Sequence, residues 1–268
     1  MPIAALIYDF DHTLTPRNMQ EFGLLRELQA EPDDFWAECR RFALKNNADG
    51  ILSYMAVTLR RAHELGLRLT REDFVRLGGT IDFYPGVEEW FEKTCAYAKE
   101  LGLELEHYII SSGLVELIEG SKIANAFKAT FAASFCYDEL GDPFWPATAV
   151  NYTAKTQYLF RINKGTLDIT NDHDLNDFTP EDKRRVLFRN MIYIGDGLTD
   201  VPCMKMTKQK GGTSIAVYEP DNADVAKALL RQRRAHYAME ADYREGSDLW
   251  HVVCGILDDI AQREREKA

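Results

Sequence analysis

The stretch IAALIYDFDHT, residues 3–13, decides how this chain folds. Its apolar run IAALIY predicts a buried β-strand, and Asp9 and Asp11 follow at the end of that strand. A continuous apolar run is typical of a parallel strand that is covered on both faces. Ligands of open α/β sheets bind at the carboxyl ends of such strands. The stretch therefore predicts a parallel α/β sheet with a charged site at the end of its first strand.

A second stretch of the same kind, MIYIGDGLTD, covers residues 191–200. Asp196 ends its apolar run, and Asp200 follows one helical turn later. Parallel strands bring their carboxyl ends to the same edge of a sheet, so these carboxylates should approach Asp9 and Asp11. Such a cluster repels itself unless a cation lies within it, and an all-oxygen cluster suits a hard ion such as Mg2+. The two stretches together predict a Mg2+ site.

Further polar residues stand where an anion could bind. A strand predicted over residues 106–112 ends in Ser111, Ser112 and Gly113, whose hydroxyl and backbone N–H groups could hold an anion before a helix. Lys155 stands at a predicted helix start, where its charge opposes the helix dipole, so an anionic partner would explain it. Taken singly, a serine–glycine turn is a common helix cap and a lysine is usually a surface residue.

The pair Asp9 and Asp11 could supply both parts of a phosphoryl-transfer reaction. A carboxylate can attack phosphorus directly and form an aspartyl phosphate. A second acid two residues later could protonate the leaving oxygen and then activate water. The alternative for this motif alone is a turn that collects aspartate and threonine. The apolar strand before it favours the charged site, because an uncompensated carboxylate there is costly.

Taken in order along the chain, these residues resemble the motifs of the haloacid dehalogenase superfamily of Mg2+-dependent phosphohydrolases. Asp9, Asp11 and Thr13 match the DxDxT motif of that family. The later motifs are matched by the remaining polar residues, namely Ser111, Lys155, and Gly195-Asp196 with Asp200. The resemblance extends from the first strand to about Val217.

The resemblance implies a role for each matched residue. Asp9 would be the nucleophile and Asp11 the general acid and base. The substrate phosphate would be bound by the polar group of the second and third motifs: Ser111, Ser112, Gly113 and Lys155. Mg2+ would be held by Asp9, the backbone carbonyl of Asp11, and Asp196. Asp200 would support the metal directly or through water.

The segment between the first and second motifs is predicted to be helical. It lies where the phosphoserine-phosphatase-like branch of the family carries a cap. We therefore expect a helical cap over residues 17–81, inserted into a Rossmann-like, doubly wound core of residues 1–16 and 82–268. That branch's phosphoserine enzymes place an acidic residue nine positions after the nucleophile, where this chain has Asn18. The substrate is therefore left open.

The other elements follow from periodicity and turn residues. Residues 130–150 are rich in aromatic and turn-forming residues and suggest a β-hairpin. Residues 213–217 form a short apolar run that predicts a strand. Helices are expected over residues 86–101 and 114–127, from Lys155, from Pro180, and over most of the chain after Asp221.

Composition limits the kinds of partner. The chain has 268 residues and a formal net charge of −11, which argues against binding to nucleic acid or to anionic membranes. Its five cysteines are scattered without a CxxC pair, as expected for reduced thiols in the cytoplasm. No apolar run approaches the length of a membrane span. We expect a cytoplasmic protein with a small phosphorylated metabolite as its partner.

The sequence thus predicts a Mg2+-dependent phosphatase that forms an aspartyl-phosphate intermediate. A phosphotransferase or mutase would use the same intermediate and pass the phosphoryl group to a second substrate. A non-catalytic binding protein could also use this fold, although the complete set of polar motif residues argues against it. Dehalogenation fits less well, because it needs neither the second acid nor the metal cluster.

Overall fold

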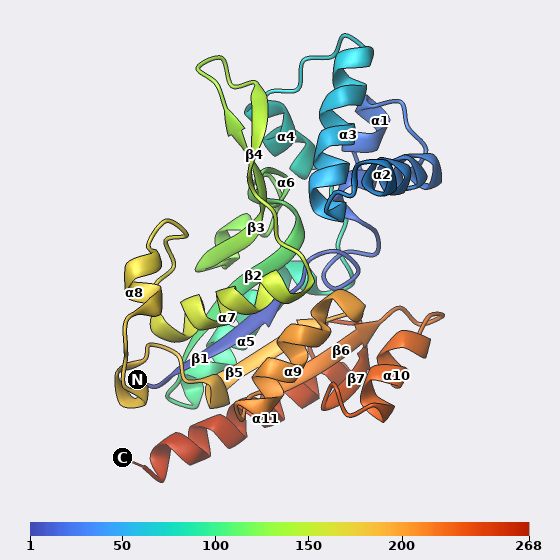
Figure 1. Cartoon of the computed structure of the whole chain (residues 1–268). Coiled ribbons are helices and arrows are strands. Elements are labelled where there is room, and N and C mark those ends of the chain that lie inside the picture. Colours follow the sequence, from blue (N-terminus) through green and yellow to red (C-terminus); the bar gives the residue numbers. More distant parts are fainter. Residues whose placement is uncertain (268) are drawn as a thin grey trace.

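A seven-stranded sheet with the order β4-β3-β2-β1-β5-β6-β7 forms the centre of the molecule. The computed structural model describes residues 1–267 (Figure 1). Every neighbouring pair of strands is parallel except β3 and β4, which are antiparallel. This arrangement confirms the predicted parallel α/β sheet. The strands are β1 (Ile3–Tyr8), β2 (Glu104–Leu114), β3 (Ala129–Tyr137), β4 (Pro143–Thr148), β5 (Met191–Gly195), β6 (Thr213–Tyr218) and β7 (Tyr237–Glu240).

Helices cover both faces of the sheet because the central strands are apolar on both sides. In β1, Leu6 and Tyr8 pack into one core cluster, and Ala5 and Ile7 pack into the other. This alternation follows from the two-residue period of a strand. Helices α5 and α11 cover the first face, and α7, α9 and α10 cover the second. Their bounds are α5 (Val87–Glu100), α7 (Lys155–Lys164), α9 (Val201–Gln209), α10 (Asp224–Arg231) and α11 (Asp248–Arg265).

The segment between β1 and α5 is helical, as predicted, and it lies beyond the carboxyl ends of the central strands (Figure 1). Asp49 caps one of its helices by accepting a hydrogen bond from the backbone N–H of Ile51 at 2.8 Å. Thr70 and Asp73 form a capping box at another. The segment contains a 3-10 turn, η1 (Met19–Glu21), and the helices α1 (Leu24–Glu27), α2 (Pro32–Asn46), α3 (Gly50–Glu64) and α4 (Arg71–Gly78).

The β3–β4 hairpin extends past the sheet and packs beside α4 (Figure 1). The rings of Phe74 and Phe135 stack with their centroids 5.7 Å apart. The backbone N–H of Arg71 donates to the carbonyl of Gly141 at the hairpin turn, at 2.9 Å. These contacts join the helical segment to the sheet at a place distant in sequence from its two ends.

Helix α4 also packs closely on α6 (Val115–Glu119), and Gly120 permits this approach. A methyl group on Gly120 would overlap the carbonyl oxygen of Val75. The same contact helps to explain why α6 ends at Glu119, where the sequence predicted a helix through residue 127. After α6 the chain forms a single 3-10 turn, Ala124–Ala126.

We expect Gly120→Ala to lower the free energy of unfolding by about 3 kcal/mol, because backbone atoms would have to move apart. Gly255→Ala is the matched control, since Gly255 lies on the exposed side of α11 with no atom near the added methyl group. That substitution should instead stabilise the protein by about 0.5–1 kcal/mol, because alanine favours helix. Urea denaturation of both variants checks this pair. Equal effects of the two substitutions would contradict the close packing of α4 on α6.

The structure differs from the sequence predictions at two other places. The helix predicted from Pro180 is only a 3-10 turn over Glu181–Lys183, because Pro180 keeps an extended backbone and the turn ends at Arg184, which is also extended. The region after Asp221 is mostly helical, as predicted, but it also contains β7, which pairs in parallel with β6 at the edge of the sheet and was not predicted. This short strand is at least partly exposed along its length and therefore has a weak apolar signal. A short helix, α8 (Asp172–Asn176), completes the α-helices of the described residues, and further 3-10 turns lie at Tyr152–Ala154, Phe188–Asn190 and Leu198–Asp200.

The five cysteines are free thiols, as predicted. Across residues 1–267, no helix has both the length and the apolar character that crossing a membrane requires.

Candidate active site

The carboxyl ends of β1 and β5 meet at the middle of the sheet and bring the two acidic stretches together. The backbone N–H of Asp9 donates to the carbonyl of Ile194 at 2.9 Å, which fixes one strand end against the other. Carboxylate oxygens of Asp9, Asp196 and Asp200 all lie within 4.8 Å of one another. The sequence predicted that the two acidic stretches lie close together, and in the structure their carboxylates form one cluster.

Lys155 lies beneath this cluster. It is the first residue of α7, and its side chain is fully buried. Its Nζ lies 2.7 Å from Oδ2 of Asp9 and 2.9 Å from Oδ1 of Asp200. Burial alone would lower the pKa of Lys155, but the charges of Asp200 and Asp9 outweigh that effect and raise it above its usual value. The lysine is therefore a permanent cation that joins two carboxylates.

Asp200 is fully buried, and hydrogen bonds hold both of its carboxylate oxygens. Oδ1 accepts from the hydroxyl of Tyr193 at 2.8 Å as well as from Lys155, and Oδ2 accepts from the backbone N–H of Gly197 at 3.3 Å. Gly195 makes room for it, because a methyl group there would lie 2.5 Å from Oδ2. These contacts anchor Asp200 more firmly than Asp196, which is partly exposed.

The acidic cluster carries more negative charge than the lysine can neutralise. Burial, followed by the charge of Asp200, raises the pKa of Asp9 to about 8. The same causes raise the pKa of Asp196 to about 7. A cation between these oxygens would relieve both costs. The all-oxygen donor set fits a hard divalent ion such as Mg2+.

Asp11 lies beside the cluster without being one of its members. Its Oδ1 accepts a hydrogen bond from the backbone N–H of Met19 at 2.7 Å, which ties it to the start of the helical segment. Burial, and then the charge of Asp9, raises the pKa of Asp11 to about 8. A carboxyl group with this pKa can hold a proton at neutral pH and give it to a neighbouring oxygen.

The turn at residues 111–113 supports the site from β2. Ser111 is fully buried, and its Oγ accepts the backbone N–H of Gly113 at 3.0 Å. The side chain of Met19 covers Gly113, and a methyl group there would require the end of that side chain to move. Ser112 is the member of the turn that lines the cavity, and its carbonyl accepts a hydrogen bond from the hydroxyl of Tyr54 at 3.0 Å.

A cavity of about 410 Å³ opens above the cluster. Asp9, Asp11, Ser112 and Asp196 line it. The other predicted residues lie behind this lining: Ser111, Gly113, Lys155 and Asp200.

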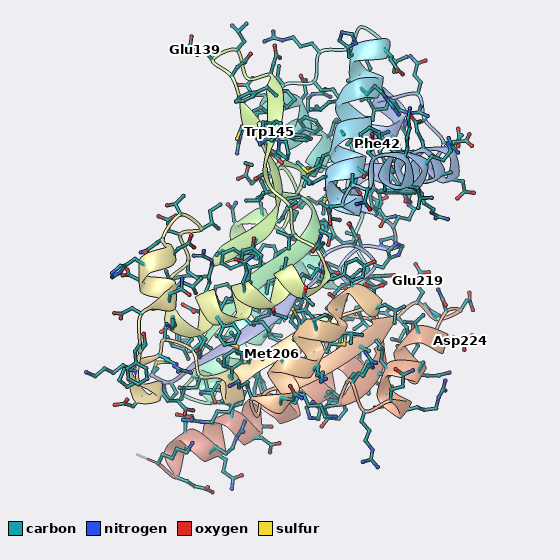
Figure 2. The ribbon with its side chains drawn as sticks, in the orientation of Figure 1. Phe42, Glu139, Trp145, Met206, Glu219 and Asp224 are labelled. Atoms are coloured by element: carbon teal, nitrogen blue, oxygen red, sulfur yellow. The ribbon has the colours of Figure 1, made fainter. Side chains whose placement is uncertain are left out.

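The cavity also has lining residues that the motifs did not indicate. Tyr84 and Glu219 are joined by a hydrogen bond of 3.0 Å from the tyrosine hydroxyl to the carboxylate. Figure 2 shows Glu219 at the carboxyl end of β6, on the side of the sheet that faces the helical segment. Its position directly after an apolar strand is the same signal that identified Asp9. Tyr84 offered no comparable signal in the sequence.

No family model matches this chain. An uncharacterized protein from Borreliella burgdorferi is 29% identical over 282 residues, an alignment that covers 94% of this chain and 95% of that protein. This similarity extends over nearly the whole of both proteins, but it brings no known activity with it.

Solved structures give the comparison for the fold. A HAD-family hydrolase from Salmonella enterica serovar Typhi has a TM-score of 0.56 and 18% identity, with 89% of this chain and 68% of that chain covered. A probable phosphoserine phosphatase from Vibrio cholerae has a TM-score of 0.59 and 14% identity, with 98% of this chain and 68% of that chain covered. A phosphoserine phosphatase solved with an analogue of its phospho-aspartyl intermediate has a TM-score of 0.53 and 17% identity. The alignment covers 94% of this chain and 98% of that chain. The chain therefore has the fold of the haloacid dehalogenase hydrolases, in the form found in phosphoserine phosphatases.

Proposed function

We propose that this protein is a Mg2+-dependent phosphatase that hydrolyses a small phosphorylated metabolite through an aspartyl phosphate on Asp9. One observation supports this proposal most strongly. Asp9 lines the cavity while Lys155 and the backbone N–H of Phe10, at 2.7 Å each, hold its two oxygens. A carboxylate so fixed is oriented toward a ligand in the cavity and needs no rearrangement before it attacks.

The reaction proceeds in two displacements. Asp9 attacks phosphorus, the bond from phosphorus to the ester oxygen breaks, and the departing alcohol takes a proton from Asp11. Water then gives a proton to Asp11 and attacks the same phosphorus, and the bond to Asp9 breaks to release inorganic phosphate. The raised pKa of Asp11, to about 8, suits it to hold the proton that the first step needs.

The remaining predicted residues surround this reaction. Asp9, the backbone carbonyl of Asp11, and Asp196 would hold Mg2+, and Asp200 would support it. When bound, Mg2+ supplies positive charge that stabilises the phosphoryl oxygens. Phosphate binding would fall to Ser112 in the cavity lining and to the groups directly behind it, namely Ser111, Gly113 and Lys155.

We propose that residues 17–81 act as a cap on a core of residues 1–16 and 82–268. Contacts near the reacting groups support this division. Met19 donates its backbone N–H to Asp11, and Tyr54 donates its hydroxyl to the carbonyl of Ser112. A cap that closes over the cavity in this way would exclude water from the charged groups while the phosphoryl group moves.

Hydrolysis of p-nitrophenyl phosphate with Mg2+, with and without a chelator, tests the proposed function. We expect turnover that the chelator abolishes. Added alcohols or sugar phosphates distinguish a phosphotransferase, which would pass the phosphoryl group to them in preference to water. Absence of turnover over a broad panel of phosphomonoesters with Mg2+ would favour a binding protein.

Mg2+ should also stabilise the folded protein. At a concentration 100 times its Kd, a ligand that binds only the folded state adds about 2.7 kcal/mol of stability. For a chain of this size we expect a rise in Tm of roughly 5–10 °C. Asp196→Asn should remove most of the rise, whereas Asp221→Asn, on an exposed loop, should keep it. Thermal melting over a Mg2+ titration checks this, and an equal rise in both variants would contradict the proposed ligand.

A further inference from the structure

One side of the cavity is built by residues that the proposed reaction does not use. They come from the end of β6, the start of α10, the segments that follow β5 and β6, and the turn before α5: Tyr84, Leu198, Tyr218, Glu219, Asn222 and Val225. They lie next to the carboxylates that would hold the phosphoryl group and Mg2+. A phosphoryl group bound at Asp9 would therefore direct its alcohol into this region.

Glu219 makes the charge on this side of the cavity negative. Within residues 1–267, the cavity lining contains neither lysine nor arginine, and its basic side chain is that of His12. Lys155 is fully buried and is already paired with two carboxylates. Glu219 thus faces the alcohol of the substrate without a lysine or arginine in the cavity lining.

Glu219 is held in place for such a role. It is partly buried, and Oε1 accepts the hydrogen bond from Tyr84, whose own side chain is 9% exposed. Burial, and then the charge of Glu219, raises the pKa of Tyr84, so the hydroxyl remains a donor. Among residues 1–267, Oε2 has no hydrogen-bond or ion-pair partner. One oxygen therefore fixes the carboxylate, and the other is available to a ligand.

The groups beside Glu219 suit an organic cation. Ammonium groups are attracted both to a carboxylate and to the faces of aromatic rings, which Tyr84 and Tyr218 supply. Leu198 and Val225 are 68% and 40% exposed and offer apolar surface to the carbon atoms next to the charge. An alcohol that carries a carboxylate or a second phosphate would meet Glu219 with no lysine or arginine in the lining to offset the repulsion.

We propose, on the basis of the proposed phosphatase activity, that the substrate is a phosphomonoester whose alcohol carries an ammonium group, and that Glu219 selects it. Glu219 is a specificity residue in this account. It takes no part in the displacement at phosphorus, so its removal should leave the hydrolysis of uncharged esters intact.

The test compares esters of similar size and different charge. The cationic ester is 2-(trimethylammonio)ethyl phosphate, the neutral ester of the same shape is 3,3-dimethylbutyl phosphate, and the anionic ester carries a carboxylate. For the unmodified protein we expect kcat/KM to be about tenfold higher for the cationic ester than for the neutral one, as for one charged contact. The anionic ester should be the poorest of the three.

Glu219→Gln should lower kcat/KM about tenfold for the cationic ester and leave the neutral ester within about twofold. Asp221→Asn is the matched control, since it removes a carboxylate of the same loop that is exposed and does not line the cavity. It should preserve the preference for the cationic ester. An equal loss on both esters in Glu219→Gln, or no preference in the unmodified protein, would overturn the proposal.

The two proposals can fail separately. If p-nitrophenyl phosphate and the neutral ester are hydrolysed without any preference for the cation, only the role of Glu219 is overturned. If no ester is hydrolysed, the phosphatase proposal fails. Calorimetry of the cationic ester can then still measure how much Glu219 contributes to its binding affinity. Tenfold weaker binding of that ester to Glu219→Gln would then support the cation site, and unchanged binding would overturn it.

Discussion

Asp9→Asn should reduce kcat for p-nitrophenyl phosphate by about 10⁴-fold or more, because an amide cannot form the acyl phosphate on which the reaction depends. The substitution keeps the shape of the side chain, so Lys155 retains a neighbour at position 9 and its ion pair with Asp200. Steady-state kinetics with Mg2+ present measure the loss. Activity above about one hundredth of the original would contradict a nucleophilic role, given the size of the effects that follow loss of a nucleophile.

The fold should survive this substitution. Asp9 has a raised pKa because burial and the charge of Asp200 outweigh its attraction to Lys155, so replacing it removes more repulsion than attraction. We expect the Tm of metal-free Asp9→Asn to equal or exceed that of the unmodified protein. Asp221→Asn controls for the loss of one formal charge and should retain full activity. A large fall in Tm in Asp9→Asn would mean that the lost activity reports unfolding.

Lys155→Met should lower the free energy of unfolding by about 3–5 kcal/mol, the cost of breaking a buried ion pair by removing one partner. The side chain of Lys155 is fully buried, and its loss leaves Asp9 and Asp200 without their common counter-ion. Lys205→Met removes an exposed lysine of α9 and should change stability by no more than about 0.5 kcal/mol. Urea denaturation of the two variants without metal makes the comparison.

A double variant of Lys155 and Asp200 tests their coupling more directly. Adding Asp200→Asn to Lys155→Met removes one of the two stranded charges, so part of the lost stability should return, about 1–3 kcal/mol. Asp200→Asn alone should be destabilising, because it breaks the same ion pair from the other side. If the double variant is as unstable as the sum of the single ones, Lys155 and Asp200 are not coupled.

The sequence was most informative where an apolar strand ends in a carboxylate. Asp9 and Asp196 could be placed together from this pattern alone, because parallel strands share an edge. The burial of Lys155 could not be predicted, since nothing in the local sequence separates it from a surface lysine. The burial of Lys155 depends on its ion pair with Asp200, whose position in the cluster is set by contacts with Tyr193 and Gly197.

The errors in the fold have a common physical cause. The apolar pattern after Leu114 continues for more than a helical turn, but the close packing of Gly120 on Val75 helps to end the helix there. The strand Tyr237–Glu240 lies at the edge of the sheet, where little burial is needed and the apolar signal is weak. In both places contacts between distant segments outweighed the local sequence.

The sequence motifs did not indicate the residues that line the cavity beside the proposed substrate alcohol. Glu219 follows the strand Thr213–Tyr218 directly, so the pattern that identified Asp9 could have identified it as well. Its partner Tyr84 lies 135 positions away in the sequence, and only the fold brings the two together. The directions in which side chains of the helical segment and its ends point also required the structure, which places Asn18 in the cavity lining.

Trapping the proposed intermediate tests the central claim most directly. The protein is mixed with substrate and Mg2+, quenched in acid within one turnover, and treated with borohydride, which reduces an acyl phosphate of aspartate to homoserine. Mass spectrometry of the peptide that contains residues 3–13 should then find homoserine at position 9, dependent on substrate and absent from Asp9→Asn. Complete turnover with unmodified aspartate at position 9, or with the modification at Asp11 or Asp196, would contradict the account.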